Sequence, residues 1–181
     1  MSEQGLSGTR RLMLAMAGGV AAAAIGQFLG RSVRLGLAVP MTGSIVAAAP
    51  RAVLLSVIAA RADRFGTLTL AGLAEGAVAI SLGAPFPLPL LTATLSGLVG
   101  DITLAALPRR YEWLRLSCSA AALCCARVLA ALAFLALVRA PMQGAMIVAW
   151  SIVAANLVLG AVAGIVAAAI VKELRHAGVM E

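Results

Sequence analysis

The stretch AMIVAWSIVAANLVLGAVAGIVAAAIV, residues 145 to 171, decides the class of this protein. It contains no charged residue, and about 20 apolar residues in a helix are enough to cross the hydrocarbon layer of a bilayer. Five further apolar runs precede it in the chain. Together the six runs predict an all-α integral membrane bundle of about six transmembrane helices. The expected spans lie approximately at residues 12–30, 36–60, 65–83, 88–107, 115–138 and 145–171.

The overall composition supports this class. The chain has 181 residues, of which 62% are hydrophobic and 12% are charged, and its mean hydropathy is +1.05. Soluble domains are only about half apolar, so lipid is the expected solvent. Six spans use nearly the whole chain, which predicts a single transmembrane domain from residue 1 to 181. The first run follows two arginines and is also compatible with a secretory signal, but its length and the five later runs favour a span.

The charged residues predict how the chain lies in the membrane. The net charge is +7, which in a soluble protein would suggest nucleic acid. Here the basic residues lie between apolar runs, so we expect no nucleic-acid partner. Nine of them fall on one side of the predicted membrane: Arg10, Arg11, Arg61, Arg64, Arg109, Arg110, Arg115, Lys172 and Arg175. Arg31, Arg34 and Arg139 fall on the other. Because cytoplasmic loops are enriched in Lys and Arg, both termini are predicted to be cytoplasmic, in a bacterial inner membrane.

Four charged residues lie inside the predicted spans: Arg51, Glu75, Asp101 and Arg127. Each is costly in hydrocarbon unless it is paired or hydrated. One hypothesis makes them structural ion pairs, Glu75 with Arg51 or Arg127 and Asp101 with an arginine near the inner side. The other assigns substrate binding to at least one of Arg51, Glu75 and Arg127. Both remain open at this point.

Two polar residues of the last run are further candidates for substrate binding, namely Trp150 and Asn156. A cavity lined by one aromatic ring, one amide and a paired charge suits a small, partly polar ring compound. Trp150 is equally consistent with the aromatic belt at a membrane interface. Asn156 needs a hydrogen-bond partner, since it lies deep in a span.

Small residues recur at helical spacing in the first run. Ala15, Gly19 and Ala23 form one row, and a second row lies beside it, formed by Gly18, Ala22, Gly26 and Gly30. Such rows allow two helices to approach closely in lipid, either within the chain or with a partner helix. Gly72 and Gly76, and Gly160 and Gly164, repeat the same spacing.

Signatures of common enzyme classes are missing from the sequence. There is no GxSxG, HExxH or P-loop motif, and the single histidine, His176, lies in the predicted cytoplasmic tail. We therefore expect no catalytic residues, no cofactor and no metal site. Cys118, Cys124 and Cys125 are expected to be small buried apolar residues. Without an ATP-binding motif the chain cannot drive transport alone by hydrolysis.

One segment carries a family resemblance. It runs from residue 61 to 72, RADRFGTLTLAG, and continues through Gly83, Pro85, Pro87, Gly97, Gly100 and Asp101. The pattern is a basic turn ending in Phe-Gly, a glycine-bearing helix, a loop rich in glycine and proline, and a helix closing in Gly-Asp. It resembles the substrate-binding S components of energy-coupling factor (ECF) transporters, and looks most like the MptD-type (Trep_Strep) branch.

The resemblance implies a function, a set of partners and two regions of interest. S components capture a vitamin or related micronutrient from outside and topple within the bilayer, while a T subunit and two ATPase subunits supply the work. The row of Ala15, Gly19 and Ala23 would be the docking surface for the T subunit. Arg31 and Arg34, in an outer loop expected at residues 31 to 35, would belong to the gate over the site.

The second run departs from that pattern. Pro50 and Arg51 stand where many such proteins carry only apolar residues, and the first half of the run is expected to be bent or partly looped. Two other functions remain open. One is a self-contained secondary transporter or channel using Glu75 or Asp101 as a proton or cation site. The other is a membrane assembly protein without a ligand.

Overall fold

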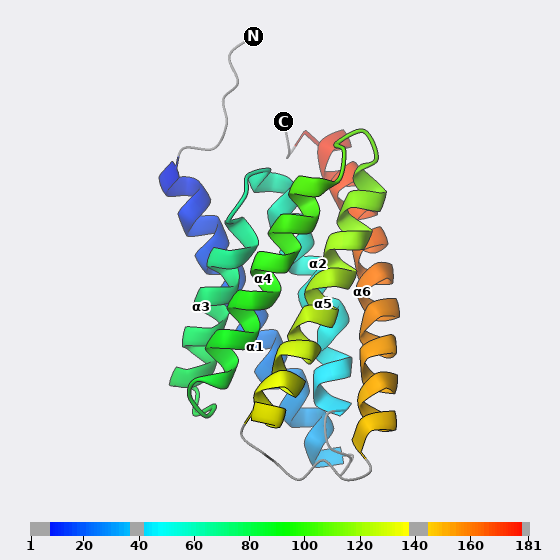
Figure 1. Ribbon diagram of the computed structural model, residues 1–181. Helices are drawn as coiled ribbons and strands as arrows, with labels where there is room; N and C mark the ends of the chain where they lie inside the picture. Colours follow the sequence, from blue (N-terminus) through cyan, green and yellow to red (C-terminus); the bar gives the residue numbers. More distant parts are fainter. Residues whose placement is uncertain (1–7, 37–41, 138–144, 179–181) are drawn as a thin grey trace.

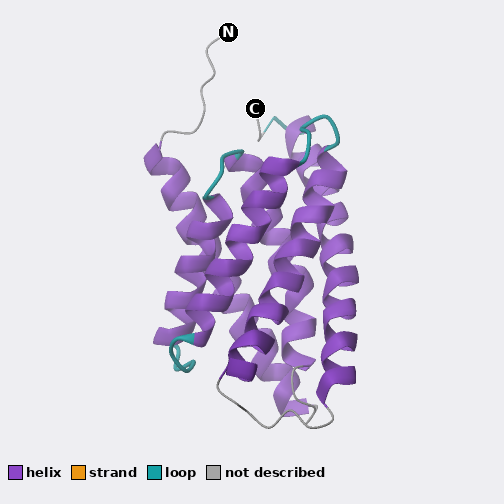
Figure 2. Ribbon diagram, in the orientation of Figure 1, coloured by secondary structure: helices purple, strands orange, loops and turns teal. Residues whose placement is uncertain are grey.

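The computed structural model describes residues 8–36, 42–137 and 145–178, and their regular structure is entirely α-helical, which confirms the expected fold class (Figure 2). The described residues form six helices: α1 (Gly8–Gly36), α2 (Thr42–Ala62), α3 (Thr67–Ser81), α4 (Leu88–Ala106), α5 (Glu112–Leu137) and α6 (Ala145–His176). The start of α1 and the end of α6 lie at the same end of the bundle, which we call the terminal end (Figure 1). The turn between α3 and α4 lies at the opposite end.

The helices form a closed ring in the order α1, α3, α4, α5, α6, α2 and back to α1. Each helix packs against its two neighbours in this order, and α2 also contacts α3 and α5 across the ring. α2 therefore lies where it can bring a side chain close to both α3 and α5. The most extensive contacts are those of α5 with α6 and of α3 with α4. Both pairs consist of helices that follow one another in the chain.

Five helices contain stretches long and apolar enough to cross a membrane: Gly8–Gly30, Ile45–Ala62, Leu88–Ala106, Glu112–Phe134 and Trp150–His176. α3 is also apolar but has only 15 residues. It begins after Gly66 and ends before Gly83, both with positive φ, so the expected span of residues 65–83 is shortened at both ends. Left-handed glycines of this kind stop helices because other residues rarely adopt that conformation.

Large apolar side chains cover the outside of the bundle. On α4 the outward face carries Leu95, Val99 and Ile102, and on α6 it carries Val158 and Val162, among others. A soluble monomer rarely exposes such continuous apolar surface, whereas lipid requires it. The chain is therefore a multi-pass membrane protein.

One predicted feature near the second span is wrong. α1 continues to Gly36, so Arg31 and Arg34 lie on its last turns and not in a loop. Residues 31 to 35, RSVRL, contain no proline or glycine that would stop the helix. α2 is helical from Thr42 and continues through Pro50, since transmembrane helices tolerate proline where neighbouring helices cover the backbone. The bent or looped first half expected for the second run falls partly on residues 37–41, which lie outside the described residues. The side chains of Arg31 and Arg34 and the expected outer loop at 139–144 lie outside the described residues.

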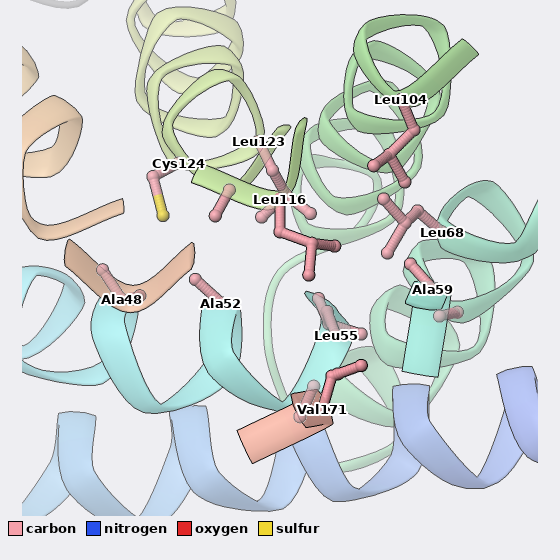
Figure 3. Close-up of a cluster of buried hydrophobic side chains, with 14 residues drawn as sticks. Ala48, Ala52, Leu55, Ala59, Leu68, Leu104, Leu116, Leu123, Cys124 and Val171 are labelled. Carbon is pink, nitrogen blue, oxygen red and sulfur yellow. The ribbon is translucent and has the colours of Figure 1, made fainter. Parts of the chain in front are cut away.

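Part of the buried apolar cluster lies toward the terminal end. Figure 3 shows Leu55, Leu68, Leu104, Leu116 and Val171 converging from five helices. Leu68 is near the start of α3 and Leu104 near the end of α4, so both lie on the terminal side of the bundle. These side chains form part of the buried apolar core.

Glycines allow the helix pairs to approach closely, as the small-residue spacing predicts. A Cβ on Gly72 would lie 2.3 Å from the carbonyl oxygen of Ala93. A Cβ on Gly164 would lie 2.4 Å from the Cα of Ser117. These positions admit no side chain, so the α3–α4 and α5–α6 contacts are backbone to backbone.

Candidate ligand-binding cavity

A cavity of about 470 Å³ lies among the helices. Its size is in the range of pockets that hold small organic molecules. It extends from Glu75 in the middle of α3 to Gly83, Ala84 and Pro85 in the α3–α4 turn, and so occupies the half of the bundle opposite the terminal end. The remaining lining residues are Ala23, Gly26, Gln27, Gly30, Ala47, Ala48, Arg51, Ala79, Leu88, Pro89, Thr92, Leu123, Cys124, Arg127, Val128, Ala131, Ile152 and Asn156.

Three charged residues in the lining form one hydrogen-bonded triad. Glu75, with only 3% of its surface exposed, accepts hydrogen bonds from Arg51 of α2 and Arg127 of α5. Arg127 binds it in a bidentate manner, with Nη2 2.8 Å from Oε1 and Nη1 3.1 Å from Oε2. Arg51 Nη2 donates to Oε1. The predicted pairing of Glu75 is therefore confirmed, but with both arginines at once.

The triad has an excess of positive charge and of donors. Two arginines and one glutamate leave a formal charge of +1, and no other charged residue lines the described part of the cavity. Among the described residues the buried Nε of Arg51 has no hydrogen-bond partner. Buried polar groups are nearly always paired, so a buried donor without a partner is an exception that needs an explanation.

The row of small residues on α1 packs within the chain, against the helix that carries Glu75. Ala15, Gly19 and Ala23 are buried, and a Cβ on Gly19 would lie 2.2 Å from the carbonyl oxygen of Ala71 and 3.0 Å from the backbone nitrogen of Glu75. The expected docking surface for a partner helix is therefore used against α3, because only residues this small let the two backbones touch. In the second row, a Cβ on Gly26 would lie 3.3 Å from Arg51 Nη1.

The two polar candidates on α6 have different positions. Asn156 is buried, lines the cavity and donates its amide hydrogen to the carbonyl of Ile152 at 2.9 Å. Trp150 is 65% exposed and is not part of the cavity lining, so the structure does not bring it together with the triad. An exposed aromatic ring near a helix end is typical of the aromatic belt at a membrane interface.

Asp101 is buried but binds backbone and not an arginine. Its Oδ2 accepts from the backbone nitrogen of Thr69 at 2.9 Å and from the Thr69 hydroxyl at 2.7 Å, and its Oδ1 accepts from the nitrogen of Leu68 at 3.2 Å. The predicted ion pair of Asp101 is therefore wrong. Gly66, at the N-cap of α3, has no side chain to cap the helix. Asp101, on α4, supplies that cap. Its negative charge is also stabilised by the positive end of the dipole of α3.

A smaller hollow of about 190 Å³ lies at the terminal end. Asp63 there forms ion pairs with Arg109 at 2.9 Å and Arg115 at 3.0 Å, and Arg11 donates to the carbonyl of Phe65 at 2.8 Å. These contacts tie the start of α1 and the α4–α5 turn to the α2–α3 turn. Their acceptors are taken from within the chain, which indicates a structural role.

The cysteines do not form a metal or redox site in the described part of the chain. No group of three or more His, Cys, Asp or Glu residues is close enough there to hold a metal ion. Cys124 is buried and lines the cavity, whereas Cys118 and Cys125 are only half-buried. The expectation that all three are buried is thus correct for Cys124 alone.

Three polar lining residues were not among the predicted site residues, namely Gln27, Thr92 and Cys124. Cys124 lies three residues before Arg127 and therefore shares its helix face, a signal that spacing alone contains. Thr92 lies on α4, whose half away from the terminal end has no charged residue, so no charge marked it. Gln27 lies on α1 four residues before Arg31, but a single amide among small residues was not distinctive.

No protein-family model, curated protein or solved structure matches the chain. The likeness to S components consequently rests on the segment from residue 61 to Asp101.

Proposed function

We propose that this protein is a membrane-embedded solute-binding protein, and specifically the S subunit of an ECF transporter that captures a vitamin or related micronutrient. The observation that carries the proposal is the cavity with its buried triad. A protein that needed these charges only for stability has no use for about 470 Å³ of space beside them.

The orientation of the bundle supports uptake from outside. All nine basic residues that were assigned to the cytoplasmic side lie at the terminal end, near the start of α1 and α5 and the end of α2, α4 and α6. The positive-inside tendency then assigns the terminal end to the cytoplasm of the cell, and the membrane to the inner membrane. In that orientation the cavity faces outward and the apolar cluster around Leu55 and Leu68 blocks the route inward.

The proposed partners are a T subunit and two ATPase subunits, since the chain has no ATP-binding motif. Because Gly19 and its row pack within the chain, the T subunit must contact another surface. The lipid-facing side of α1, with the exposed residues Met13, Met16 and Val20, is available for that contact. Unbranched methionine side chains adapt well to a partner surface.

The alternatives have less support. A proton or cation site needs a carboxylate with a free oxygen, but both oxygens of Glu75 accept from arginines and both oxygens of Asp101 accept from α3. An assembly protein without a ligand does not account for the cavity or for the unpaired Arg51 Nε.

The proposal is tested by tagging the protein in its own host, solubilising it gently and identifying by mass spectrometry what co-purifies. We expect a T subunit, two ATPases and a bound metabolite. Liposomes containing the chain alone should show no solute flux, and flux should require the partners and ATP. A homodimer that transports a solute without ATPases would overturn the proposal in favour of a secondary transporter.

A further inference from the structure

The charge of the cavity limits what can fill it. The described lining has a formal charge of +1, contributed by Arg51, Glu75 and Arg127. An uncompensated charge is unfavourable in a low-dielectric interior, so a ligand with one negative charge is the best electrostatic match. A dianion would leave an uncompensated negative charge in the same place.

The hydrogen-bonding capacity points the same way. A guanidinium only donates, and Glu75 accepts one hydrogen bond from Arg51 and two from Arg127. Arg51 is nine-tenths buried and its Nε lacks a partner. A ligand carboxylate supplies the acceptors that these donors need. A cationic ligand finds little acceptor capacity on the triad, because Glu75 already accepts three hydrogen bonds, and it would add to the positive charge of the site.

The rest of the wall describes the remainder of the ligand. Leu123, Val128 and Ile152 contribute apolar surface to the cavity. Thr92 and Asn156 contribute polar groups to the same wall. The volume suits a molecule of one or two rings with little polarity beyond its acid group.

We infer that the cavity binds a compact, water-soluble organic acid through a single carboxylate, which accepts hydrogen bonds from the donors of Arg51 and Arg127 that Glu75 leaves free. Glu75 holds the two guanidiniums together when the site is empty and lowers the charge of the site to that of one anion. This inference rests on the proposed solute-binding function and names the chemical class of the solute.

The first test uses the purified full-length chain in phosphatidylcholine nanodiscs. Thermal unfolding is measured with a set of one-ring and two-ring monocarboxylic acids, each beside its primary amide and its amine. Members of the acid set should raise the Tm, and the amide and amine of the same skeleton should not. If amides or amines stabilise equally well, the inference is overturned and the solute-binding function stands. If no compound of any class stabilises, both are overturned.

The second test uses the most stabilising acid and variants of the triad. Arg51→Gln and Arg127→Gln should each weaken its binding by about tenfold or more, since each removes a charge-assisted hydrogen bond. Arg175→Gln removes an arginine at the terminal end and is the matched control, which should leave affinity unchanged. The Tm without acid reports whether each variant is folded, and Arg127→Lys, which keeps the charge without the fork, should be intermediate.

The third test changes the charge without removing an arginine. Glu75→Gln raises the formal charge of the lining from +1 to +2. In this variant the affinity for the dicarboxylate of the same skeleton, relative to that for the monocarboxylate, should be about tenfold higher than in wild type. This is the effect expected of one additional matched charge. An unchanged preference contradicts the inference.

A last arm separates a soluble acid from a lipid headgroup. Adding phosphatidylglycerol to the nanodiscs should leave the acid-induced Tm shift unchanged. If phosphatidylglycerol itself raises the Tm of wild type but not of Arg51→Gln, the site belongs to an anionic lipid and the inference is overturned.

Discussion

Glu75 and Asp101 are both carboxylates buried inside a membrane bundle, yet their surroundings differ in every respect. Glu75 lies beside the larger cavity, in the half opposite the terminal end, and binds two arginines. Asp101 lies in the tightly packed half near the terminal end and binds the backbone at the start of α3. Its neighbours Gly97 and Gly100 lie so close to Leu68 that added Cβ atoms would be under 3 Å from it.

The difference shows that a buried charge in a membrane protein has two separable uses. Asp101 lines the smaller hollow of about 190 Å³, but both of its oxygens accept hydrogen bonds from the start of α3, so its charge builds the fold. At Glu75 donors exceed acceptors and space remains, so the charge prepares a site. The residues that carry the family resemblance, from Phe65 and Gly66 to Asp101, mostly serve the first use.

Removing the carboxylate of the triad is expected to have the largest effect. Glu75→Ala leaves two arginines facing each other without a partner, which should lower the free energy of unfolding by about 3–5 kcal/mol. Chemical unfolding in detergent measures this. Replacing all three triad residues by leucine should recover most of the loss, because no unpaired charge remains. A triple variant as unstable as Glu75→Ala would show that the loss comes from packing instead.

Removing the cap of α3 is expected to have the next largest effect. Asp101→Ala deprives the nitrogens of Leu68 and Thr69 of their acceptor and should destabilise by about 2–3 kcal/mol. Asp101→Asn retains one acceptor and should lose about half as much. Both variants, once folded, should bind ligand with wild-type affinity, as measured by titration calorimetry. Weakened binding in Asp101→Asn would contradict the separation of the two regions.

The same substitution at two positions of α1 sharpens the comparison. Gly19→Ala brings a Cβ against the backbone of Ala71 and should cost about 1–3 kcal/mol of stability through overpacking. Gly26→Ala meets only the guanidinium of Arg51, which can move, so stability should change little while ligand affinity falls. Thermal unfolding and ligand titration of the pair distinguish these effects. Equal destabilisation would mean that Arg51 is as rigid as backbone.

The smallest effect is expected at the exposed ion pair of the terminal end. Arg175 binds Glu112 through two hydrogen bonds of 2.5 and 2.7 Å, but its side chain is half exposed. Arg175→Gln should change the free energy of unfolding by about 1 kcal/mol or less, because solvent screens such pairs. Added salt should reduce even that difference. A loss comparable to that of Asp101→Ala would contradict the assignment of this pair to the solvated surface.

The candidate site was predictable only in part. Arg51, Glu75 and Arg127 stand out because a charge in an apolar run is conspicuous, and they do meet in space. An aromatic ring in an apolar run suggests a ligand contact, but the side chain of Trp150 is exposed on the outside of α6. The sequence predicts an arginine as the partner of Asp101. In the structure its oxygens instead accept hydrogen bonds from the start of α3, where Gly66 has no side chain to cap the helix.

The sequence by itself determined that this is an α-helical membrane protein, where its long apolar segments lie and at which end its basic residues gather. Those properties follow from hydrophobicity summed over about 20 residues, which needs no knowledge of neighbours. Only the tertiary structure decided that the small residues of α1 pack within the chain, that Asp101 caps α3 and that two arginines share Glu75 beside a cavity. These outcomes depend on how each helix is rotated about its axis, and that rotation is set by backbone contacts at glycines such as Gly19 and Gly72, far apart in sequence from the residues they meet.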